Sequence, residues 1–115
     1  LAQNDLDRAQ NFFDEGLLMA TQLSIPERIA GLTANLGLVA AKRGETSVAI
    51  HRLSTALAQA DSLHTHHLAA QIRIWLAPLL PRDEAKMRLN EARAIAESGG
   101  RKRLLEEIEK LEVRS

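Results

Sequence analysis

The chain has 115 residues, a length that suits one domain or part of one. Its 15 basic and 15 acidic residues balance, which argues against a face that binds nucleic acid or an anionic membrane. Cysteine is absent, which excludes disulfides, a thiol nucleophile and thiolate metal sites. No apolar run approaches the roughly 18 residues that a membrane-spanning helix needs. We therefore expect a cytoplasmic protein.

Apolar residues recur at helical spacing along the whole sequence, and no segment alternates as a strand does. Six helices are predicted, over about residues 5–23, 24–43, 46–60, 64–79, 82–97 and 101–113. Ser24 and Glu27 have capping-box spacing at the start of the second helix, and Gly44 is expected to end it. A turn is expected at 61–63. The predicted fold class is all-α.

A row of three residues at i, i+4 and i+7 occurs on alternate helices. Its members are Ala9, Phe13 and Gly16, then Ala49, Leu53 and Ala56, then Ala85, Leu89 and Ala92. The first position moves from residue 9 to 49 and then to 85, so the periods are 40 and 36 residues. Small residues at the outer positions allow two helices to approach closely. The pattern therefore indicates repeated helix pairs.

Residues 30–63 resemble the tetratricopeptide repeat (TPR). The matching positions are Leu36, Gly37 and Ala40 on the first helix of the pair and Ala49, Leu53 and Ala56 on the second. Thr33, Ala40 and Leu53 stand where the family usually has Trp, Tyr and Phe, and in the next unit Arg73 holds the glycine position. The resemblance implies a short right-handed α-solenoid of antiparallel helix pairs.

In this register the chain divides into four parts. They are a partial repeat (1–23), a repeat (24–63), a degenerate repeat (64–98) and a C-terminal capping helix (101–114). Residues 1–4 are interpreted as the end of a missing first helix, so we expect the chain to be a fragment or processed product of a larger protein. The repeat periods and the segment 94–101 (Ala-Ile-Ala-Glu-Ser-Gly-Gly-Arg) resemble the TPR arrays of bacterial maltose-regulator-like transcription activators and signal-transduction ATPases.

The resemblance implies a non-catalytic module that binds a protein or peptide partner or senses an effector, within a transcription or signalling regulator. The groove side of the repeats would carry Asn35, Leu38, Lys42, His67, Gln71 and Ile74. A second surface is expected on helix 5–23, where Phe12 and Phe13 would offer an apolar face for self-association. Trp75 is expected to pack inside the fold.

Two other classes of function stay open. His64 and His67 have i, i+3 spacing that suits a divalent metal, so a small metal-binding helical protein is one alternative, although no third ligand lies one turn further on. A purely structural or oligomerisation segment of a larger enzyme is the other. No phosphate-binding glycine loop or serine nucleophile motif occurs, so we expect neither catalysis nor a cofactor.

Overall fold

The computed structural model describes residues 3–114 of the chain. These residues form six α-helices and one short 3-10 helix, and no strand occurs among them. The elements are α1 (Gln3–Gln22), α2 (Pro26–Lys42), α3 (Thr46–Leu63), α4 (His66–Leu76), η1 (Ala77–Leu79), α5 (Arg82–Ser98) and α6 (Lys102–Arg114). The predictions of an all-α fold and of six helices are confirmed.

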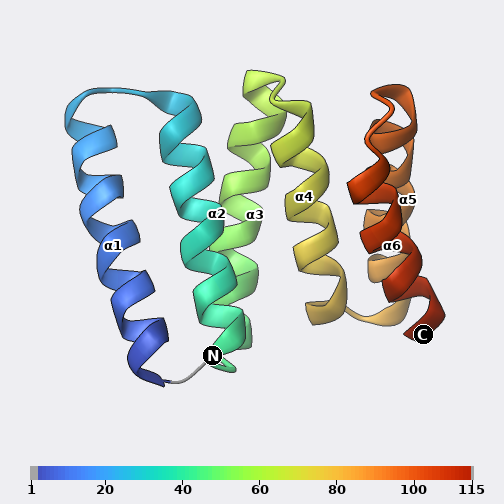
Figure 1. Ribbon diagram of the computed structural model, residues 1–115, viewed down its shortest axis with the longest axis horizontal. Helices are drawn as coiled ribbons and strands as arrows, with labels where there is room; N and C mark the ends of the chain where they lie inside the picture. The colour runs from blue at the N-terminus through green and yellow to red at the C-terminus, as the bar shows by residue number, and fades with distance from the viewer. Residues whose placement is uncertain (1–2, 115) are drawn as a thin grey trace.

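Each helix packs antiparallel against the next one along the chain (Figure 1). Further contacts join α2 to α4 and α4 to α6, so that alternate helices also touch. In the view of Figure 1, α3 lies behind α2 and α5 lies behind α6. No helix within residues 3–114 has both the length and the apolar character needed to cross a membrane.

Two of the predicted turns differ from the structure. Ser24 does not cap α2, because it has a φ of +53° and closes the end of α1, where the Ile25 amide donates to the Ala20 carbonyl oxygen. Ile25 is the N-cap residue of α2 and makes no side-chain capping bond. The prediction of a Ser24–Glu27 capping box is therefore wrong.

The turn predicted at 61–63 lies slightly later, because α3 continues to Leu63. His64 ends that helix with a left-handed φ of +57°, and α4 begins only at His66. Gly44 ends α2 as predicted, with a φ of +78° that favours glycine. At the N-terminus, Gln3 and Asn4 belong to α1, whereas residues 1 and 2 of the interpreted missing helix lie outside the described residues.

The core consists of two clusters of buried apolar side chains. The first joins α2, α3 and α4, and the half-buried Trp75 packs against it, as predicted. The second joins α4, η1, α5 and α6 around Leu89, Leu104 and Ile108. Both clusters contain many alanines, which brings neighbouring backbones close together.

Helices α2 and α3 approach each other closely at Gly37. A methyl group added there would come within 2.7 Å of Leu53 Cγ and 3.2 Å of the Leu53 backbone nitrogen. Leu53 and its neighbours in the row, Ala49 and Ala56, are fully buried. The predicted arrangement of small and large residues between these two helices is present in the structure.

Candidate interaction surfaces

An exposed apolar stripe runs along helix α1 and one residue past its end, and is formed by Phe12, Met19 and Leu23. These side chains are 70%, 60% and 63% exposed. Their spacing of i, i+7 and i+11 places them on one side of the helix. On a neighbouring face of the helix Leu6 and Ala20 are buried. Helix α1 therefore uses one face for packing and leaves a second apolar face open.

The two adjacent phenylalanines have different environments. Phe12 is exposed, whereas Phe13 is half-buried. Their rings meet edge to face, with centroids 5.7 Å apart and an angle of 72° between the planes. At Gly16 the helix comes close to α2, since an added methyl group would lie 3.3 Å from Leu32 Cδ2. Of the two rings predicted to form a self-association surface, Phe12 is the more accessible.

The opposite end of the helix row is polar. Helix α6 buries Leu104 and Ile108 against the second core cluster. Its exposed described side chains are charged, apart from that of Val113. The two ends of the molecule are therefore chemically different: α6 presents a solvated face, and α1 presents the apolar stripe.

The predicted groove residues on α2 remain accessible to different degrees. Lys42 is exposed, and Asn35 and Leu38 are half-buried. Consecutive members of this set are about one helical turn apart, at i, i+3 and i+7, so the three residues share a face of α2.

The predicted groove residues on α4 lie next to α6. Gln71 Nε2 donates to Glu107 Oε2 at 3.1 Å, and Ile74 is only 4% exposed within the second core cluster. His67 is exposed, with its Nδ1 3.5 Å from Arg101 Nη1. Because α6 lies along this side of α4, Ile74 offers no surface to a partner in this arrangement and Gln71 is already hydrogen-bonded.

The histidines of the metal-binding alternative lie on two different elements. His64 is the C-cap residue of α3, and His67 belongs to the first turn of α4. The rings of His64 and His66 are 6.3 Å apart between centroids. Within residues 3–114, no group of three or more histidine or acidic residues is placed to hold a metal ion.

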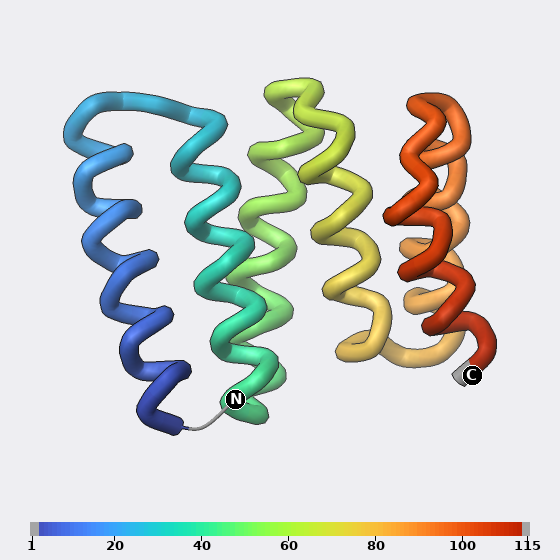
Figure 2. Tube along the Cα trace, in the orientation of Figure 1, coloured from blue at the N-terminus to red at the C-terminus, as the bar shows by residue number. Residues whose placement is uncertain are grey.

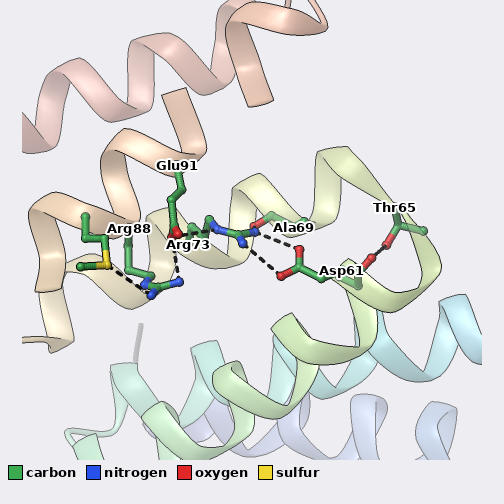
Figure 3. Close-up of polar contacts among 8 residues, drawn as sticks. Asp61, Thr65, Ala69, Arg73, Arg88 and Glu91 are labelled. Carbon is green, nitrogen blue, oxygen red and sulfur yellow. Dashed lines mark hydrogen bonds and ion pairs between the residues drawn. The ribbon is translucent and has the colours of Figure 1, made fainter. Parts of the chain in front are cut away.

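A buried arginine joins three helices, and the repeat pattern marked it only as a departure from the usual glycine. Arg73 on α4 is 9% exposed. Its Nη1 and Nη2 donate to the two carboxylate oxygens of Asp61 on α3, at 3.1 and 3.0 Å, and its Nε donates to Glu91 Oε1 on α5, at 3.2 Å (Figure 3). Nη1 also donates to the Ala69 carbonyl oxygen at 3.2 Å.

The charges of this cluster stabilise the guanidinium. Burial disfavours the charged form of Arg73, but hydrogen bonds and charge attraction from Asp61 and Glu91 outweigh it, so the pKa of Arg73 is raised. Arg88 Nη1 shares Glu91 Oε1 at 2.7 Å from a more exposed position. Each of the three guanidinium nitrogens of Arg73 thus donates to a partner within the fold, which gives the cluster a structural role.

No protein-family model, no curated protein and no solved structure matches this chain.

Proposed function

We propose that the chain is a non-catalytic protein-interaction module, built as a short right-handed TPR-like stack of helix pairs in a bacterial transcription or signalling regulator. The contacts of α2 with α4 and of α4 with α6 support the stack, because in such repeats the first helix of each pair touches the first helix of the next. The close approach of Gly37 and Leu53 supports the pairing within one repeat.

The apolar stripe of Phe12, Met19 and Leu23 is the observation that carries the binding function. Burial of a large apolar side chain contributes roughly 1.5–3 kcal/mol, so three open ones on one face are a strong driving force for association. From Phe12 to Leu23 the stripe covers 11 residue steps, or about 16 Å at a helical rise of 1.5 Å per residue. An amphipathic helix of the partner, with apolar residues about two turns apart, matches this length and chemistry.

The surroundings of the stripe favour a helix over an extended peptide. Helix α1 has no unpaired strand edge to extend, and α2 lies beside it near Gly16 and Leu32. A docked helix would thus continue the row of antiparallel helices. The open face of α2, with Asn35, Leu38 and Lys42, is a second candidate contact.

The test uses a designed amphipathic helical peptide with leucines two turns apart, and its binding is followed by fluorescence anisotropy. We expect Phe12→Glu to weaken binding by tenfold or more, the effect of losing about 1.5 kcal/mol of apolar burial. The matched control is Leu18→Glu, since Leu18 is also on α1 and is 62% exposed but lies outside the stripe. Equal binding by the two variants would reject the stripe as the docking surface.

Light scattering distinguishes a separate partner from a second copy of the chain. A parent protein that is monomeric and binds the peptide supports the proposal. A parent that dimerises, with Phe12→Glu monomeric and Leu18→Glu still dimeric, would assign the stripe to self-association and make the chain an oligomerisation segment.

A further inference from the structure

A cleft opens at the end of the molecule remote from α1, between η1, the start of α5 and the end of α6. Figure 2 shows the connection between α4 and α5 at the same end as the C-terminal turn of α6. The cleft has a volume of about 710 Å³, within the usual range of roughly 300–1,000 Å³ for small-molecule sites. Six of its lining residues are apolar: Ala77, Pro78, Leu80, Ala85, Leu89 and Leu111.

Two cations stand on one side of this apolar cleft. Arg82 and Lys86 both line it, are exposed, and are four residues apart on α5. Within residues 3–114 neither side chain has a hydrogen bond or an ion pair to another residue. Like charges at i, i+4 repel each other, so an anion placed between them would be stabilised by both.

The acidic groups near the cleft, in the part of the chain that the structure describes, form no ion pair with these two cations. Glu112 lines the opposite side, and its carboxylate is bonded to Arg93. The sequence neighbours of Arg82, Asp83 and Glu84, are not among the lining residues. The cleft therefore combines apolar walls with two lining cations that form no ion pair with a described residue, next to one lining carboxylate that is bonded to Arg93.

We infer that this cleft binds a single-chain amphiphile that has an apolar tail of medium length and a terminal carboxylate. The tail lies mainly against the half-buried Leu80 and Leu111, where it removes apolar surface from water, and Leu89, which is almost buried, forms the floor of the cleft. The carboxylate lies at the edge, beside Arg82 and Lys86. This site is independent of the stripe on α1, and its test does not depend on the docking of a partner.

Octanoate is the probe, and methyl NMR spectra of the leucine-labelled protein report where it binds. We expect saturable shifts of the methyl signals of Leu80, Leu89 and Leu111. Octanol has the same tail without the charge and should bind more weakly, and octylammonium should bind more weakly still. Added salt should weaken octanoate binding, because the two cations are exposed to solvent.

Two variants of the cleft test the two halves of the site. The double variant Arg82→Gln with Lys86→Gln should weaken octanoate binding about fivefold, since each exposed ion pair is worth a factor of about two to five, and should leave octanol binding unchanged. Ala85→Met should fill the cleft and weaken both ligands. The matched control is Arg8→Gln with Arg28→Gln, two exposed cations on α1 and α2 that do not line the cleft.

The inference is overturned if the double variant binds octanoate as tightly as the control variant. It is equally overturned if octanol binds as well as octanoate, or if the shifts appear at Met19 and Leu23 and not at the cleft. Circular dichroism of each variant confirms that the helices are retained, so that a loss of binding is assigned to the site.

Discussion

Arg73 and Asp61 form a bidentate ion pair that fixes α4 to the last turns of α3, with both N–O distances near 3 Å. A planar guanidinium matches a carboxylate in this way, and its remaining Nε–H is free to reach a third helix through Glu91. The boundary between the two core clusters is thus held by directed polar contacts as well as by apolar packing.

We predict that Arg73→Ala lowers the free energy of unfolding by about 2 kcal/mol. Loss of one partner from a fully buried pair costs about 3–5 kcal/mol, and the value here is lower because the Asp61 and Glu91 side chains are 47% and 39% exposed. The apolar stem of Arg73 adds to the loss. Urea unfolding followed by circular dichroism measures the change.

The control is Arg88→Ala, which removes the other arginine on Glu91 and should cost less than about 1 kcal/mol, as exposed pairs do. Arg73→Lys should restore less than half of the loss, because an ammonium group cannot make the bidentate contact. Equal destabilisation by Arg73→Ala and Arg88→Ala would show that the cluster does not hold the helices together.

A second prediction compares two glycines of α2. Gly37→Ala should destabilise the fold by about 1–3 kcal/mol through overpacking against Leu53, even though alanine favours helix. Gly31→Ala should stabilise it by about 0.5–1 kcal/mol, because nothing lies within 4 Å of the added methyl group. Thermal unfolding of both variants gives the result, and a shift of the same sign for both would contradict the packing of α2 on α3.

The pattern of apolar and small residues was sufficient to predict the close packing of α2 on α3 around Leu53. A helical period predicts which face of each helix is buried, and the i, i+4, i+7 row predicted that Leu53 would fill the space beside small residues. The role of Ser24 was not predictable in the same way. Its spacing to Glu27 suits a cap, but the preceding helix uses Ser24 in a left-handed conformation to end itself.

Interactions between residues far apart in the sequence account for the other features of the structure that the sequence pattern did not predict. Arg73 lies between Ile72 and Ile74, and its partners are 12 and 18 residues away, so only the packed helices bring them together. The repeat register placed Ile74 on the groove side, but it did not predict that α6 covers that part of α4. The exposure of Phe12 and the half-burial of Phe13 likewise depend on how α1 is rotated against α2.

A third prediction concerns the row on α3. Ala56→Leu should lower the free energy of unfolding by about 1–3 kcal/mol, because Ala56 is fully buried beside Ala34 and Leu53. Ala58→Leu places the same side chain at an exposed position of the same helix and should change stability by less than about 0.5 kcal/mol. Urea unfolding of the two variants, compared with the parent, measures the difference. An unchanged urea midpoint for Ala56→Leu would contradict the predicted register of the repeat.

The fourth prediction is a pH dependence at the contact between α1 and α2. Arg43 Nη2 lies 2.5 Å from Asp7 Oδ1, and this hydrogen bond lowers the pKa of Asp7 against the smaller opposing effect of desolvation. A carboxyl group whose pKa is lower in the folded state stabilises the fold above its ordinary value of 3.8, and that contribution is lost as the pH falls below it. Asp7→Asn should therefore unfold at a lower temperature than the parent near neutral pH, and the difference should disappear as the pH falls well below 3.8. Asp14→Asn changes another exposed aspartate of α1 and serves as the control. A difference between Asp7→Asn and the parent that persists unchanged in acid would show that the charge of Asp7 is not what joins α1 to Arg43.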